Sequence, residues 1–493
     1  MKLSDLCFWR QTNAKASASL KTLARASFCL LAVGCGGFRP TGANVYQIPW
    51  PDENGKYQLQ NVPIESYDQP AGLQGRFVQI FVNPSVVDGQ MQSEQSVGHY
   101  LRNRDGVMVP TDYTSVEAAA IHAHFERLLK MDTELKAVAN WPARIAIDVN
   151  VHANGKPAVN NAFFTEELDA LFLPPYTALD VPIAVNGGVL AHEHFHRIFQ
   201  AMVFKRIGKG GHFPRGLQIF KEHAFWDDNA SDEMVSVLPA EKDSSEQSKP
   251  QEQQVAKYNA FYLSALNEGL ADFWGWVYTS DPNFIKASLP KLGSLRRLDV
   301  KPVERLASKP QLLAWTTGTT VDGKALTVEQ LKANSYSVGT TYARFMRELT
   351  QSLAQGKDVS RAERMKMAAA VIAILPEFAE KIAQTIRARE LINPNTFVVM
   401  LYPKLAVSDD SADSRFCRTL RRWSAPEWEQ EMQAIKCIEP RRSTPRPPKT
   451  PVTPGQTKTP ATGTTTPASG SGKGTTPKAP GKPSTTPHDQ ESK

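Results

Sequence analysis

Residues 187–199 read Gly-Gly-Val-Leu-Ala-His-Glu-His-Phe-His-Arg-Ile-Phe and contain the spacing His-Glu-x-x-His. On an α-helix, residues four apart lie on one face, so His192 and His196 are expected to project side by side. Two imidazole nitrogens placed in this way can coordinate one Zn²⁺ ion. Glu193, one position further round the helix, can accept the proton of a water that the ion activates. His194 points to the opposite side and is not expected to be a ligand.

The residues around this motif predict a buried helix. A metal-binding helix inside a protein is apolar almost all round, and here the flanking positions are Val189, Leu190, Ala191, Phe195, Ile198 and Phe199. The alternative is a surface helix that carries its histidines by chance. The apolar flanks argue against that alternative, because unpaired polar rings are costly to bury.

A third ligand is expected from the stretch Asn-Glu-Gly-Leu-Ala-Asp at residues 267–272. A catalytic zinc ion keeps three protein ligands and one open position, and we assign the third to Glu268. Asp272 lies one turn later on the same face, and two like charges at this spacing repel. A zinc ion on Glu268 would offset that repulsion, and Asp272 could accept the outer N–H of a ligating histidine. The alternative is an amphipathic helix with a solvated acidic edge.

His-Glu-x-x-His followed by Asn-Glu-x-x-x-Asp resembles the thermolysin and fungalysin families of gluzincin zinc metallopeptidases. Residues 160–164, Asn-Asn-Ala-Phe-Phe, resemble the edge strand that binds the substrate backbone in these families. The resemblance implies that Asn161 and Ala162 hold a peptide substrate in an extended pose. It also implies one bound Zn²⁺ ion and hydrolysis of peptide bonds by an endopeptidase.

The resemblance extends to residues 336–339, Tyr-Ser-Val-Gly, which are similar to the family segment that donates a hydrogen bond to the tetrahedral intermediate. Tyr336 stands where the family has a histidine, and a tyrosine hydroxyl can also donate to a developing oxyanion. Tyr342 is a second candidate for this donor. The interval between His196 and Glu268 is much longer than in thermolysin.

The N-terminus predicts export. Basic residues precede a short apolar run at residues 28–35, as in a secretory signal peptide, and the run is too short to span a membrane. Ala-Val-Gly-Cys at its end resembles a bacterial lipobox, which implies a lipid anchor at Cys35 and a place in the cell envelope, most simply as an outer-membrane lipoprotein. The alternatives are an ordinary signal peptide and a secreted protein. Cys417 and Cys437 then remain as one even pair, either a disulfide or two reduced thiols.

The expected fold class is α+β, a two-lobed gluzincin-like metallopeptidase with a β-rich N-terminal lobe, a mainly helical C-terminal lobe and the zinc helix between them. We divide the 493 residues into a signal peptide (1–34), an N-terminal β-rich region (35–110), a catalytic α+β lobe with the metal helix (111–204), a polar insertion (205–260), a helical C-terminal lobe (261–440) and a disordered tail rich in Pro, Thr and Lys (441–493).

The net charge of +7 does not indicate a nucleic-acid partner, because the excess of basic residues lies in the leader and the tail. We expect a monomer that acts on peptide or protein substrates. Two other functions stay open: an envelope lipoprotein whose zinc site is only structural, and a zinc aminopeptidase. An intact Glu193 argues against the first, because a structural site needs no general base. The second would need an acidic anchor for the substrate amine, for which the sequence has no motif.

Overall fold

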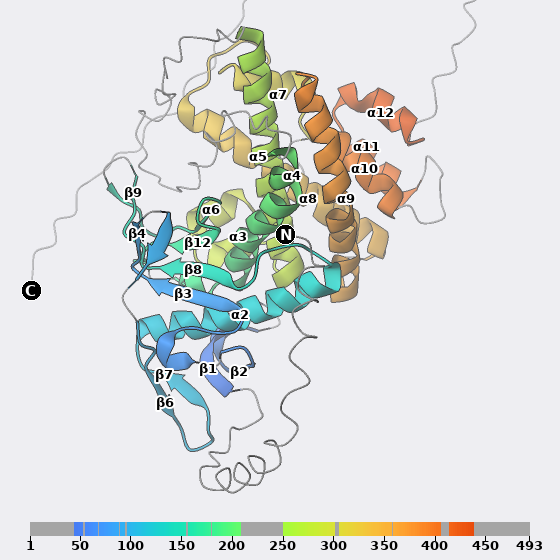
Figure 1. Ribbon diagram of the computed structural model, residues 1–493. Coiled ribbons are helices and arrows are strands. Elements are labelled where there is room, and N and C mark those ends of the chain that lie inside the picture. The colour runs from blue at the N-terminus through green and yellow to red at the C-terminus, as the bar shows by residue number, and fades with distance from the viewer. Residues whose placement is uncertain are drawn as a thin grey trace, which may run out of the picture. The chain divides into compact units, whose positions relative to one another are not determined.

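The computed structural model is mixed α/β, with a β-rich N-terminal region and a helical C-terminal part (Figure 1). The expected signal peptide, Cys35 and the tail 441–493 lie outside the residues that it describes, and those predictions stay untested. So does most of the expected insertion 205–260. The structure describes residues 44–437 except 53–54, 68, 88, 94–95, 154–155, 179, 209–249, 301–304, 357 and 406–413.

A first four-stranded sheet has the order β2-β1-β7-β6. Its strands are β1 (Asn44–Pro51), β2 (Tyr57–Ile64), β6 (Tyr100–Arg102) and β7 (Met108–Pro110). β1 pairs antiparallel with β2 and parallel with β7. Alternate side chains of β1 are buried, namely Tyr46, Ile48 and Trp50, and they form a small core with alanines of helix α2 (Tyr113–Leu135). This period of two is what a half-buried strand requires.

A second four-stranded sheet has the order β11-β12-β8-β3. Its strands are β3 (Val78–Val82), β8 (Ala143–Ile147), β11 (Phe163–Thr165) and β12 (Ala170–Leu173). β3, β8 and β12 are parallel, and β11 runs antiparallel at one edge. The sheet is apolar on both faces. On β8, Ile145 and Ile147 belong to the main core, whereas Phe163 and Phe172 belong to a separate small cluster. Helix α2 lies between the two sheets (Figure 1).

The remaining strands form two small hairpins. They are β4 (Ser85–Val87) with β5 (Gln90–Gln92), and β9 (His152–Ala153) with β10 (Lys156–Pro157). The described part of the expected β-rich region 35–110 contributes strands to both four-stranded sheets. It contributes β3 to the same sheet as β8, β11 and β12, since β3 pairs with β8 along its whole length.

Helices form most of the described residues after residue 186. The α-helices are α3 (Gly187–Phe199), α4 (Lys205–Gly208), α5 (Pro250–Thr279), α6 (Pro290–Leu295), α7 (Lys309–Thr316), α8 (Val328–Ala354), α9 (Arg361–Arg387), α10 (Thr396–Leu405), α11 (Arg415–Trp423) and α12 (Glu429–Ala434). Short turns of other helix types are η3 (Pro70–Gly72), η4 (Ile183–Val185), η5 (Gln200–Phe204, a π-helix), η8 (Phe284–Ala287) and η9 (Pro426–Trp428). No helix among the described residues is both long and apolar enough to cross a membrane.

The expected end of the polar insertion at residue 260 falls inside α5, which begins at Pro250. The sequence Gln-Glu-Gln-Gln at residues 251–254 has no apolar residue, since these positions are exposed or half-buried. α5 packs against α3 on one side and against α8 on another. At the crossing with α8 the two backbones touch, since a Cβ atom added to Gly269 would lie 2.2 Å from the carbonyl oxygen of Gly339. Only glycine allows helices to approach so closely.

Candidate metal centre

Helix α3 begins at a well-connected N-cap. The side-chain oxygen of Asn186 accepts hydrogen bonds from the backbone N–H groups of Gly188 and Val189, as an N-cap residue does. Its side-chain nitrogen donates to the carbonyl of Phe284 and to the hydroxyl of Ser288, at 2.9 Å each. Every residue of α3 except His196 is buried, which confirms the expectation of a buried helix. The start of the helix is thus fixed to a segment almost a hundred residues later.

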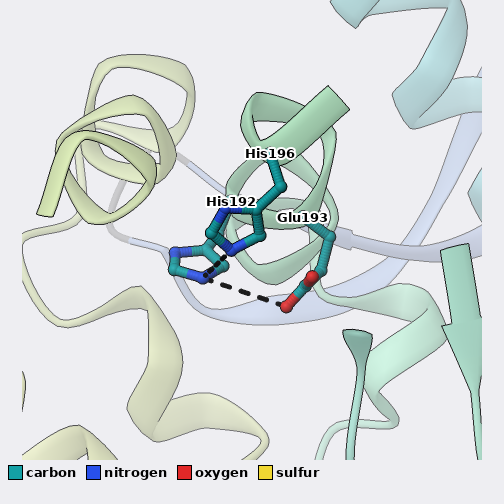
Figure 2. A group of neighbouring side chains, drawn as sticks. All are labelled: His192, Glu193 and His196. Atoms are coloured by element: carbon teal, nitrogen blue, oxygen red, sulfur yellow. Dashed lines mark hydrogen bonds and ion pairs between the residues drawn. The ribbon is translucent and has the colours of Figure 1, made fainter. Parts of the chain in front are cut away.

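His192, Glu193 and His196 lie close enough together to hold a metal ion. The Nε2 atoms of the two imidazole rings are 3.1 Å apart, and Oε1 of Glu193 is 3.9 Å from Nε2 of His192. Figure 2 shows both rings and the carboxylate extending from α3 toward one another. Two imidazoles and a carboxylate are a donor set suited to Zn²⁺ among other divalent ions.

Glu268 reaches the same place from α5. Its Oε2 lies 3.5 Å from Nε2 of His192, and its Oε1 lies 3.5 Å from Nε2 of His196. The structure therefore places the expected third ligand, Glu268, beside the two histidines. The residues between His196 and Glu268 are described only in part. Burial raises the pKa of the Glu268 carboxyl, but His196, His192 and Arg296 outweigh it and hold that pKa well below its usual range. The carboxyl is ionised, as a ligand must be.

Asp272 lies on the other side of the His192 ring. Its Oδ1 is 3.2 Å from Nδ1 of His192, where an acceptor for the outer N–H of a ligating histidine belongs. Burial lowers the pKa of His192, but the Asp272 and Glu268 carboxylates together raise it to about 9. The carboxylates hold a proton on this imidazole, and a divalent ion would have to replace it.

A buried arginine that the sequence analysis missed stands beside both carboxylates. Arg296, directly after α6, donates from Nε to Oδ2 of Asp272 (3.0 Å) and from Nη2 to Oδ1 of Asp272 (2.6 Å). The same Nη2 donates to Oε2 of Glu268 (3.1 Å). The argument that the acidic pair needs a zinc ion to offset its repulsion is therefore corrected, because Arg296 already supplies a positive charge. In the sequence it is not distinguished from the adjacent Arg297, which pairs with Asp299 near the surface.

Glu193 has the surroundings of a general base. It is 4% exposed, and its Oε2 has no hydrogen-bond partner among the described residues. Burial raises the pKa of this carboxyl, an effect that His192 and His196 reduce. A raised pKa brings a carboxylate closer to the range in which it accepts and returns a proton near neutral pH.

Tyr336 lies beside these groups. The guanidinium of Arg296 stands over its ring, 5.4 Å from the centroid. Burial and the Glu268 carboxylate raise the pKa of Tyr336 above its usual range, so its hydroxyl stays protonated and can donate.

Tyr342 does not reach the candidate metal centre, and its expected role as a second donor is withdrawn. Its hydroxyl donates a 2.6 Å hydrogen bond to the carbonyl of Pro394, and its ring contacts Tyr262 in the core. Tyr336 and Tyr342 are six residues apart on α8, and six residues turn a helix by about 240°. The two hydroxyls therefore point to different sides of the helix.

Asn161 and Ala162 lie directly before β11, and both are 2% exposed. The backbone N–H of Ala162 already donates to the side-chain oxygen of Asn161 (2.8 Å), so this N–H is not free to hold a substrate backbone. β11 forms one edge of its sheet and packs against α3. The expected substrate strand thus lies next to the metal helix, with the strand itself beginning at Phe163.

Cys417 and Cys437 form a disulfide with a Cα–Cα distance of 4.9 Å, the first of the two alternatives for this pair. It joins α11 to the segment after α12. A comparison of the chain with protein-family models finds no match, and a comparison with curated proteins finds none either.

Proposed function

We propose that this chain is a zinc-dependent metallopeptidase that cleaves internal peptide bonds. One observation carries the proposal: the Glu268 carboxylate of α5 faces both imidazoles of α3, with 3.5 Å from each Nε2 to one of its oxygens. A glutamate on one helix and a His-x-x-x-His pair on another make the donor set of a catalytic zinc site with three protein ligands. The resemblance to gluzincins noted in the sequence supports the same reaction.

Bound at His192, His196 and Glu268, zinc would polarise the scissile carbonyl and lower the pKa of a water molecule. In such a site Glu193 would accept a proton from the attacking water and pass it to the leaving amine. Tyr336 donates its hydroxyl to the developing oxyanion. β11 offers its edge to an extended peptide, which would add to the sheet as another strand.

The proposal also includes the export of the protein and its anchoring to a membrane. The leader 1–34 and Cys35 support export and a lipid anchor in a bacterial envelope, with the catalytic part acting there as a monomer on peptides or proteins.

The test compares wild type with Glu193→Gln and Glu268→Gln. Each protein is measured for bound zinc by elemental analysis and for cleavage of a peptide library by mass spectrometry. Glu193→Gln should keep its zinc and lose cleavage by a factor on the order of 10² to 10⁴, the contribution of a general base. Glu268→Gln should lose zinc as well. Glu377→Gln, an exposed glutamate on α9, is the matched control and should change neither.

Equal cleavage by wild type and Glu193→Gln would remove the catalytic claim and leave a structural zinc site. A digest in which only N-terminal residues are released would instead identify an aminopeptidase.

A further inference from the structure

The side of α3 that faces away from the candidate metal centre carries two buried polar residues, His194 and Arg197. At 100° per residue, His194 lies opposite the mean direction of His192 and His196, and Arg197 lies about 120° from that direction. Their exposed fractions are 0% and 2%. Polar side chains at such positions need partners, because burying them without hydrogen bonds is costly.

His194 has its partner on α2. Its Nε2 is 2.9 Å from Oδ2 of Asp132, which is 2% exposed. The His194 ring also contacts Phe125 of α2 and Trp141, with ring centroids 5.7 Å and 5.3 Å apart. The pair is therefore enclosed by aromatic rings and screened from water.

Arg197 has partners in two further segments. Its Nη2 donates to the carbonyl of Asn140, and its Nε lies 3.5 Å from Oδ1 of Asp169. The guanidinium also stands over the ring of Trp141, 5.7 Å from the centroid. The side of α3 away from the candidate metal centre thus has polar contacts with three parts of the chain, at Asp132, Asn140 and Asp169.

Apart from Glu193 and the two metal-site histidines, the remaining side chains of α3 are apolar and belong to the main core, namely Val189, Leu190, Ala191, Phe195, Ile198 and Phe199. Apolar contacts are not directional, so alone they allow alternative rotations of a helix that is apolar all round. A rotation by one residue would turn His192 and His196 away from Glu268 by 100°. The same rotation would separate His194 from Asp132 and leave both polar groups buried without partners.

We propose that His194 and Asp132 are positioning residues of the metal centre: this buried pair sets the rotation of α3 about its own axis, so that both His192 and His196 face Glu268. The inference rests on the proposed function for its consequence, the zinc affinity. Stability alone does not account for the pair, because replacing both partners of a buried hydrogen bond by apolar groups of the same shape can be nearly neutral or stabilising.

Because replacing both partners can leave stability nearly unchanged, the test can separate the effect of the pair on the rotation of α3 from its effect on stability. The variants are His194→Phe, Asp132→Leu and the double variant, which replaces the whole pair by apolar groups. His99→Phe is the matched control, since it removes a His–Asp contact at the surface (Nδ1 to Oδ2 of Asp112, 2.6 Å). Stability is measured by urea unfolding, and zinc affinity by competition with a chelator.

Both single variants should unfold at lower urea concentration, because each leaves one polar group buried without its partner. The double variant should recover most of that loss. Its dissociation constant for zinc should nonetheless rise by about tenfold or more, the range found when residues that orient metal ligands are removed. His99→Phe should change neither quantity. Wild-type zinc affinity in the double variant would overturn the proposal, because the remaining contacts of α3, among them those of Arg197 and Asn186, would then set the rotation without this pair.

A readout without zinc keeps this inference distinct from the proposed function. The ¹⁵N chemical shifts of the His192 and His196 rings in the metal-free protein report their contacts with Asp272 and Glu268. These shifts should change in the double variant and stay unchanged in His99→Phe. If wild type binds no zinc, the proposed function fails while the shifts still decide the role of the pair. Unchanged shifts in the double variant would overturn it.

Discussion

Adding one methyl group where α5 and α8 cross should impair the candidate metal centre more than it impairs folding. A Cβ atom at residue 339 would lie 2.6 Å from the carbonyl oxygen of Ala265, 2.9 Å from the backbone nitrogen of Gly269 and 3.1 Å from Cβ of Glu268. Two of these neighbours are helix backbone, which cannot turn away as a flexible side chain does. The substitution Gly339→Ala must therefore move α8 away from α5.

The size of the movement follows from these distances. Ordinary van der Waals contact begins at 3.4 Å, so the gap to the Ala265 oxygen must widen by 3.4 minus 2.6, or about 0.8 Å. Tyr336 lies one turn before Gly339 and moves with the helix. Overpacking of a core costs about 1–3 kcal/mol, and the better helix propensity of alanine returns about 1 kcal/mol. The net loss of stability is at most about 2 kcal/mol.

The effect on the reaction is larger, because a misplacement of roughly 1 Å can lower a rate by about a hundredfold. The assay is kcat on a cleaved peptide, with bound zinc and the urea midpoint measured on the same samples. Gly356→Ala is the matched control, since an added Cβ there meets nothing nearer than 3.9 Å. It should behave as wild type. Wild-type kcat in a folded Gly339→Ala protein would refute the reasoning that this crossing positions Tyr336.

Three further outcomes are expected. Arg296→Met should lower the free energy of unfolding by about 3–5 kcal/mol, because it leaves two carboxylates without their buried partner. Arg297→Met, which removes an ion pair at the surface, should leave the free energy of unfolding almost unchanged by the same urea measurement. Burial raises the pKa of Glu117 to about 8, so the folded chain keeps a proton that the unfolded chain loses, and the free energy of unfolding falls as pH rises from about 4.5 to about 8. Urea titrations across that range should show this fall in wild type and a flatter profile in Glu117→Gln. Replacing both Cys417 and Cys437 by alanine should lower the free energy of unfolding by about 3 kcal/mol, since their bond closes a loop of about twenty residues. An unchanged midpoint of thermal unfolding would contradict this.

The candidate site could be predicted from the sequence where its residues share one helix. His192, Glu193 and His196 are related by helical spacing alone, and their apolar neighbours indicate burial. Glu268 and Asp272 could be assigned to the same site because they share one helical face in an apolar stretch and because Asn-Glu-x-x-x-Asp resembles the gluzincin segment. Which side of a helix faces a particular partner depends on contacts with a distant segment. Tyr336 and Tyr342 could therefore not be separated until α8 was placed against α5.

Arg296 could not be predicted because its role depends on contacts between distant segments. A charged residue is exposed in most contexts, and the sequence Leu-Arg-Arg-Leu at residues 295–298 does not show which arginine is buried. The start of α5 was missed for a related reason. Its first turns lack an apolar face, and helical periodicity is visible in a sequence only where one face is buried.

The place of β3 has a consequence for how the proposed enzyme could be kept inactive. Many secreted hydrolases are made as zymogens, whose N-terminal segment is cut away during maturation. A cut that released residues 44–82 from this chain would remove β3 and leave β8 as a new, unpaired sheet margin. It would also take away Tyr57, whose hydroxyl accepts from the first backbone N–H of α3. Latency, if the cell needs it, must come from a means other than excising this stretch.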